Sequence, residues 1–282
     1  MKVFTSTGGF KHLNFYQAAN KLIGLGCQKI ELSAGGYIPN VRHYINLLEA
    51  DCELMLHNYF PVPSKPFVIN LSSNDSELLS RSLSLAKFAI DISSEIGSPF
   101  YGVHSGFRLN LQPKDLGQVK QIYPLMTKNQ SVDIFRRSLT ELGKYASKRN
   151  VSLLVENNVL SKLNHDLFRE NPFLMVDPVE IREIIESLDC EISLLLDLAH
   201  LKVSSETLKF PLEEAVKFLN PIVQGYQVSE NDGIEDRGFA FDESAWFLNL
   251  IEKSKNFVTI ELSEQSFTNY HSTYMTLRSF LE

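Results

Sequence analysis

Short apolar runs alternate with longer amphipathic segments from one end of the chain to the other, and the alternation repeats eight times. A short, continuous apolar run is typical of a strand that is buried on both faces of a parallel sheet. The pattern therefore indicates βα units around such a sheet. The runs expected to form strands are 3–5, 29–32, 54–57, 101–104, 153–156, 194–197, 225–228 and 258–261.

Helix signals fill the segments between these runs. Residues 79–90 repeat apolar side chains at helical spacing, with Asn74 or Asp75 as the N-cap and Gly97 as the stop. Residues 177–180, Asp-Pro-Val-Glu, indicate an N-cap, a proline at the first helical position and a capping-box glutamate. Apolar stripes of this kind are expected to face a core.

Eight βα units in 282 residues suit one barrel, because such barrels take about 250 residues. We predict an α/β fold, a (β/α)8 TIM barrel, formed as a single domain by residues 1–282. Two connections, 105–130 and 157–176, are longer than a barrel needs. Both follow strands and so belong at the carboxyl face, where we favour a role as substrate covers over simple decoration.

Composition narrows the choice of partners. With 27 basic and 34 acidic residues the net charge is −7, so no overall field attracts nucleic acid. No apolar run approaches the ~20 residues of a membrane span and the start lacks a signal-peptide segment, so we expect a cytoplasmic protein without membrane contact. Cys27, Cys52 and Cys190 lack the spacing of metal or disulfide cysteines. A small polar substrate and a metal cation fit the net negative charge better than nucleic acid does.

Polar side chains stand at the ends of six predicted strands. A packed barrel interior is normally aliphatic, so burying such groups is unfavourable unless they share a cation or bind a polar ligand. One residue of this kind, such as Asp197, is equally well explained as a turn or helix-cap residue. The repetition favours a common site at the carboxyl end of the barrel. The residues are His57, His104, Glu156, Asp197 with His200 after it, Gln227 and Glu261.

Four of these residues end successive strands, and neighbouring strands lie about 4.8 Å apart, so the side chains can converge on one cation. The predicted ligands are Glu156, Asp197, Gln227 and Glu261. Three carboxylates and an amide oxygen suit Mn²⁺ or Mg²⁺ better than Zn²⁺, which is the alternative metal. The competing interpretation is four unlinked polar strand ends, which would leave buried carboxylates uncompensated.

Six motifs, taken in their order and spacing, resemble those of a known family. They are His57-Asn58-Tyr59-Phe60, Ile69-Asn70-Leu71-Ser72-Ser73, Val103-His104-Ser105-Gly106, Leu154-Val155-Glu156-Asn157-Asn158, Asp197-Leu198-Ala199-His200 and Ile260-Glu261. The family is the xylose-isomerase-like TIM barrels, which include sugar isomerases, ketose 3-epimerases, hydroxypyruvate isomerase and the endonuclease IV group. The resemblance implies one divalent metal at the carboxyl face, held by the four residues named above. Because members are commonly dimers or tetramers, it also implies a homodimer or homotetramer.

Residues 227–233 are similar to the strand-seven segment of the ketose epimerases, with one departure. Those enzymes normally have a histidine ligand where this chain has Gln227. A glutamine carbonyl oxygen coordinates a metal more weakly than imidazole does, so the departure bears on metal affinity and metal choice.

The resemblance implies a metal-dependent isomerase or epimerase of a sugar or a small hydroxy-carbonyl compound. In such enzymes the metal holds the substrate oxygens while two glutamates move a proton through an enediolate. Glu156 and Glu261 are assigned as this catalytic pair, because they end strands five and eight. The candidates for substrate binding are His57, His104, His200 and Arg237.

These four binding candidates have other interpretations. A histidine at a strand end often only hydrogen-bonds to ligands. A guanidinium pairs with a carboxylate or phosphate, which makes Arg237 and Arg108 candidate anchors, although exposure to solvent is the simpler expectation for Arg108.

Two other functions stay open. An endonuclease-IV-like phosphodiesterase would use His57 and His104 with Glu156, and His200 with Asp236 and a histidine at position 238, where this chain has Gly238. The missing histidines degrade that multi-metal site. Gln227 and Gly238 also motivate a third interpretation, a non-catalytic barrel that has lost turnover, which the retained glutamate pair keeps from ranking first.

Overall fold

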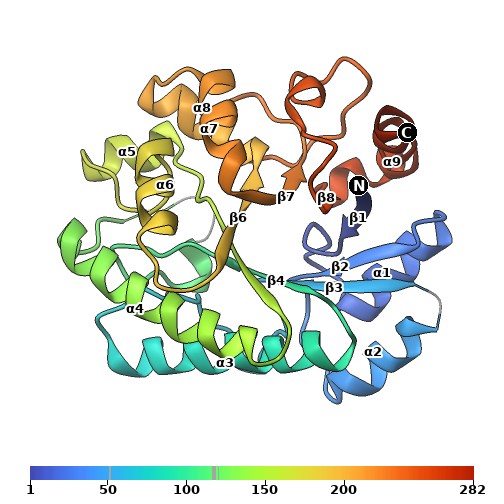
Figure 1. Ribbon diagram of the computed structural model, residues 1–282, viewed down its shortest axis with the longest axis horizontal. Coiled ribbons are helices and arrows are strands. Elements are labelled where there is room, and N and C mark those ends of the chain that lie inside the picture. Colours follow the sequence, from blue (N-terminus) through green and yellow to red (C-terminus); the bar gives the residue numbers. More distant parts are fainter. Residues whose placement is uncertain (51, 116–118, 120) are drawn as a thin grey trace.

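The computed structural model describes residues 1–50, 52–115, 119 and 121–282. Eight parallel strands close into a barrel in the order of the sequence, and the last strand pairs with the first. The helices lie around the outside of this barrel (Figure 1). The architecture confirms the predicted (β/α)8 TIM barrel.

Each strand lies within two residues of its predicted run at either end. The strands are β1 Lys2–Ser6, β2 Lys29–Leu32, β3 Glu53–His57, β4 Phe100–His104, β5 Ser152–Glu156, β6 Ile192–Asp197, β7 Val223–Val228 and β8 Phe257–Ile260. Glu261 therefore follows β8 directly instead of ending it.

Helices follow the strands, with an exception after β7. The α-helices are α1 Phe15–Gly24, α2 Val41–Glu49, α3 Ser76–Glu95, α4 Lys128–Ser147, α5 Lys162–Phe168, α6 Pro178–Glu186, α7 Leu198–Leu208, α8 Leu212–Leu219 and α9 Tyr270–Leu281. The 3-10 helices are η1 Pro113–Asp115, η2 Asn220–Ile222, η3 Leu248–Leu250 and η4 Glu264–Asn269. Within the described segment 229–256 the short η3 takes the place of the α-helix that a regular βα unit would have.

Two predicted helix starts are confirmed. Asp75 caps α3 by accepting hydrogen bonds from the Glu77 and Leu78 amides, and Gly97 follows the helix with a φ of +67°. Asp177 caps α6, and Pro178 occupies the first turn. The capping-box prediction for Glu180 is wrong. Its carboxylate makes no hydrogen bond within the described chain and lies 3.4 Å from Lys128 on α4 instead.

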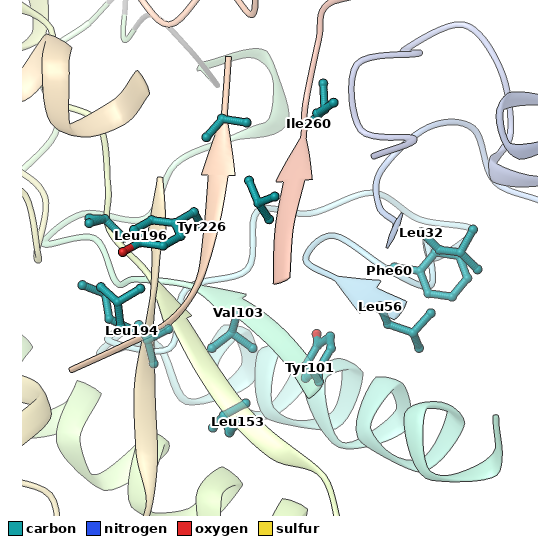
Figure 2. Packing of buried hydrophobic residues seen from close by; sticks show 14 of the residues in the cluster. Leu32, Leu56, Phe60, Tyr101, Val103, Leu153, Leu194, Leu196, Tyr226 and Ile260 are labelled. Atoms are coloured by element: carbon teal, nitrogen blue, oxygen red, sulfur yellow. The ribbon is translucent and has the colours of Figure 1, made fainter. Parts of the chain in front are cut away.

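The core has two layers. One lies between the barrel and its helices and takes apolar side chains from the outward faces of the strands, among them Leu194 and Leu196 on β6 and Tyr226 on β7 (Figure 2). The other fills the barrel interior and is a small apolar cluster. Its buried members are Phe4, Met55, Leu154, Leu195 and Phe257.

The two long connections pack against each other. Phe107 and Phe173 form an antiparallel bridge, and their rings meet edge to face at 5.5 Å. Arg108 is buried and donates to the Met126 carbonyl at 3.0 Å and to the Asn171 carbonyl at 2.6 Å. Arg108 is therefore a structural clamp between the loops and neither faces solvent nor anchors a substrate.

The predicted loop at 105–130 is described only in part. Of the predicted loop 105–130, residues 116–118 and 120 lie outside the described residues. In the described chain, no helix combines the length and the apolarity that crossing a membrane requires.

Candidate active site

The pleat of the strands decides which side chains enter the barrel. Successive residues point to opposite faces, so every second residue of a barrel strand points inward. On β6, Leu194 and Leu196 belong to the outer layer, which puts Leu195 and Asp197 on the inner face. Glu156 takes the same position on β5. The interior is thus apolar in its lower part and polar at the carboxyl ends of the strands.

The Glu156 carboxylate is the centre of the polar layer. Its Oε2 lies 2.8 Å from Nε2 of His57 and 2.9 Å from Nε2 of His104. Its Oε1 lies 3.0 Å from Nδ1 of His200. Glu156 and His57 are buried, whereas the His104 side chain is 40% exposed. The three predicted histidines therefore converge on one glutamate.

Asp197 has both of the roles that its sequence context allows. Its Oδ1 accepts a hydrogen bond of 2.7 Å from the His200 backbone and so caps α7. Its Oδ2 faces the His200 ring at 3.9 Å. Asn157 holds the strand end in place, because its side chain donates to the Asp197 carbonyl and accepts from the Asp197 amide. Asn157 was not among the predicted site residues.

Gln227 is turned toward Glu261. Its amide nitrogen donates a hydrogen bond to the Glu261 carboxylate. Its carbonyl oxygen is buried and has no hydrogen-bond partner among the described residues. An orphaned carbonyl oxygen beside a carboxylate is a chemically suitable pair of donors for a hard cation.

Burial and neighbouring charges shift the titration of the site. Burial would raise the pKa of Glu156, but the His104 and His57 charges hold it well below the usual range. Burial raises the pKa of Asp197 to about 7, against the opposing charge of His200. Burial likewise raises the pKa of Glu261 to about 8, with the charge of His57 opposing the shift. Carboxylates in this position are the groups that a bound cation would return to the charged state.

Glu31 is a site residue that the strand-end pattern missed. It is fully buried on β2, accepts a hydrogen bond of 3.1 Å from Thr259, and lies 3.9 Å from Nδ1 of His57. The sequence does carry a signal for it, because a lone carboxylate stands between the apolar Ile30 and Leu32. The search for residues at strand ends passed over it.

The described residues contain three groups in which one ligand atom from each member lies within 4.8 Å of the others. The groups are His57 with His104 and Glu156, Glu31 with His57 and Glu261, and Glu156 with Asp197 and His200. Glu156 and Asp197 thus share a group, while Glu261 gathers with residues of β2 and β3. The donor set suits a divalent metal, and the histidines add nitrogen donors to the predicted oxygen ligands.

A cleft of about 230 Å³ opens above these groups. Six predicted site residues line it, whereas His57 and Gln227 are buried and do not line it. Asp236 also lines it, and its Oδ2 lies 3.2 Å from Nε2 of His200. The lining residues from the prediction are His104, Glu156, Asp197, His200, Arg237 and Glu261.

Gly238 has no room for the histidine of the endonuclease IV pattern. Its φ is +58°, a left-handed conformation that a side chain rarely adopts. A Cβ added there would lie 2.8 Å from the Ser263 backbone nitrogen. The backbone at this position is therefore built for glycine.

The sequence matches the model of one known protein family. The family model described as xylose isomerase-like TIM barrel matches residues 39–266. The chain belongs to the xylose isomerase-like TIM barrel family. The match includes the strands that bear His57, His104, Glu156, Asp197 and Gln227, and it confirms the resemblance that the motifs carry. No curated protein matches the sequence significantly.

Solved structures share this family fold over the full length of the chain. A D-tagatose 3-epimerase-like protein has a TM-score of 0.73 and 18% identity, over 100% of this chain and 97% of its own. A 3-keto-D-glucoside 4-epimerase from E. coli has a TM-score of 0.68 and 12% identity, over 99% of both chains. A xylose isomerase-like TIM barrel protein from Mycobacterium smegmatis, in complex with magnesium, has a TM-score of 0.68 and 13% identity, over 100% and 98%. At these identities the likeness shows the fold.

Proposed function

We propose that this family member is a divalent-metal-dependent isomerase or epimerase of a sugar or a small hydroxy-carbonyl compound. The sugar epimerases among its structural neighbours support this class of reaction. The acidic, histidine-rich cleft supports the dependence on a metal.

One observation carries the proposal. Glu156 at the end of β5 and Glu261 after β8 line the same cleft, and they enter it from strands three places apart in the closed ring. A substrate in the cleft therefore meets a carboxylate on each of two sides. One carboxylate removes a proton from the carbon beside a carbonyl, and the other returns a proton to it or to its neighbour.

The surrounding residues hold this pair in place. His57 and His104 fix Oε2 of Glu156, and Gln227 fixes the Glu261 carboxylate through its amide nitrogen. His200 contacts the other Glu156 oxygen and faces Asp236, so it joins the proton-transfer pair to the rim of the cleft. The hydroxyl groups of a sugar would find donors in His104, His200 and Arg237, which line the cleft.

A divalent cation would be held by the predicted set of ligands, supported by the orphaned carbonyl oxygen of Gln227. When bound, it supplies a positive charge that polarises the substrate carbonyl and acidifies the neighbouring C–H. Mn²⁺ or Mg²⁺ is the favoured ion and Zn²⁺ the alternative. The set comprises Glu156, Asp197, Gln227 and Glu261.

Solvent-deuterium exchange at the carbon beside the carbonyl tests the assignment. Ketoses and keto acids are incubated in D₂O with the wild-type protein and with Glu156→Gln, Glu261→Gln and Glu183→Gln. We expect exchange with wild type and with the exposed control Glu183→Gln, and a loss of about 10²-fold or more in either site variant. Full exchange in Glu156→Gln or Glu261→Gln would remove that residue from the proton-transfer pair.

The grouping of His57, His104 and Glu156 is the observation that favours the second candidate, a multi-metal phosphodiesterase. The left-handed Gly238 opposes it, since a ligand of that pattern has no place there. Elemental analysis of the purified protein separates the two functions. Two or more zinc ions per chain, together with cleavage of abasic duplex DNA, would favour the phosphodiesterase over the isomerase.

A further inference from the structure

The active-site cleft continues into a second, outer cleft. The inner cleft of about 230 Å³ and the outer one of about 530 Å³ share Gly9, Lys11, Arg237 and Ser263 as lining residues. His12, Glu235 and Phe239 complete the lining of the outer cleft. A substrate whose reacting carbons lie in the inner cleft therefore has room to extend past Lys11 and Arg237.

The β1–α1 loop brings Lys11 to this boundary through close backbone packing. A Cβ on Gly9 would lie 1.8 Å from the Leu262 carbonyl oxygen, so only glycine lets the loop lie flat against the segment after β8. Phe10 then anchors the loop, because it is buried and its ring lies 5.6 Å from the ring of Phe267. The next two residues, Lys11 and His12, are exposed at the rim.

The two clefts differ in charge. Three carboxylates of the catalytic and metal set line the inner cleft, and Asp236 adds a fourth acid. In the outer cleft, the single lining acid Glu235 is already paired with Arg237, at 3.1 Å from Nη2, and Asp232 lies 3.6 Å from Nε of the same guanidinium. Lys11 has no ion-pair partner among residues 1–50, 52–115, 119 and 121–282. The positive charge left unpaired at the rim is therefore that of Lys11, beside a guanidinium that two carboxylates already compensate.

We propose that the outer cleft is a subsite for an anionic group of the substrate, a phosphate or a carboxylate, bound by Lys11 and Arg237 with His12 at its edge. This inference rests on the proposed function, because it places the reacting carbons in the inner cleft. The acidic inner cleft repels an anion while the unpaired charge of Lys11 at the rim attracts it, so the anionic group points outward. An ammonium and a guanidinium both donate charge-assisted hydrogen bonds to oxyanions, and they set the orientation of the bound substrate.

Calorimetric titration with inorganic phosphate, and separately with acetate, tests the subsite without any turnover. The proteins are wild type, Lys11→Met, the charge-preserving Lys11→Arg and a control, Lys148→Met. Lys148 is exposed and caps the C-terminal end of α4, and it does not line either cleft. We expect saturable binding of one anion by wild type, Lys11→Arg and Lys148→Met, and binding at least about tenfold weaker in Lys11→Met. The anion that binds identifies the group as phosphate or carboxylate. No binding by wild type, or equal weakening in both methionine variants, would overturn the subsite.

Deuterium exchange on matched substrates separates this inference from the proposed function. A ketose and its terminal phosphate ester, or its carboxylate analogue, are compared. We expect Lys11→Met to raise KM for the anionic substrate about tenfold or more while leaving the neutral one unchanged. Equal effects on both substrates would refute the subsite and leave the isomerase assignment standing. Anion binding that depends on Lys11, without exchange on any substrate, would support the subsite and refute the isomerase assignment.

Discussion

Gly102 makes room for the buried face of the site. It stands on β4 beside His57, and a Cβ there would lie 2.5 Å from Cδ2 of the imidazole ring. The ring in turn is held by Glu156 at 2.8 Å, so it has no free direction in which to move. The absence of one methyl group therefore lets the histidine reach the glutamate.

Replacing Gly102 with alanine is expected to destabilise the fold by about 1–3 kcal/mol, because the added methyl overpacks the interior. Gly24 gives a matched comparison, since a Cβ on that exposed residue in α1 meets nothing within 4 Å. Gly24→Ala is expected to stabilise the fold by about 0.4–1 kcal/mol through the unfolded chain. Urea unfolding measures both variants. A Gly102→Ala protein as stable as wild type would contradict the packing argument.

Glu31 shows what single-residue reading of the sequence missed. The prediction inspected the last residue of each strand, and β2 ends in Leu32. The pleat, however, turns Glu31 inward, and the stagger of the barrel brings it to His57 and to Thr259 of a distant strand. Which inward side chains meet depends on the register between strands, which a single sequence does not contain. Asp197 was predictable because it is the last residue of β6 and its side chain also points into the barrel.

Among the elements, α6 has a buried glutamate, Glu180, in its first turn. Within the described residues its carboxylate forms an ion pair with Lys128 of α4, at 3.4 Å. Burial raises the pKa of this glutamate, and the charge of Lys128 offsets the shift only in part. Folding therefore makes this carboxyl group harder to ionise than it is in the unfolded chain.

The free energy of unfolding should fall as the pH rises above the ordinary glutamate pKa of 4.5. Above that pH the unfolded chain loses the Glu180 proton while the folded protein, with its raised pKa, still holds it. The contribution is fully present below that value and is lost as the pH passes the raised pKa. The difference in unfolding free energy between Glu180→Gln and wild type should therefore shift in favour of the variant as the pH rises from below 4.5 to above the raised pKa. Denaturant unfolding across this range measures the shift. The exposed Glu183→Gln on the same helix is the control, and an equal shift there would contradict the prediction.

The elements themselves were largely readable from the sequence. Asp75 and Asp177 mark helix starts through local side-chain chemistry, and the apolar runs mark the strands through burial. The segment after β7 was not readable in this way. Its short η3 contacts α8 and buries Leu248 in the outer core layer, a tertiary arrangement with no local sequence signal.

At the scale of the whole molecule, barrel closure makes the site. Residues from 31 to 261 in the sequence meet because β8 pairs with β1 and the order of the strands follows the chain. The order of the strands around the ring also sets the two glutamates on different sides of one cleft. We propose that Glu156 and Glu261, which this closed ring brings to one cleft, transfer a substrate proton when a divalent ion is bound.

The most direct measurement of that claim is solvent-deuterium incorporation into a ketose by one preparation of protein in three states. These are the protein as purified, the protein stripped by a chelator, and the stripped protein reloaded with Mn²⁺ or Mg²⁺. We expect exchange in the first state, a loss of about 10²-fold or more in the second, and recovery in the third. Undiminished exchange in the stripped protein would contradict that claim.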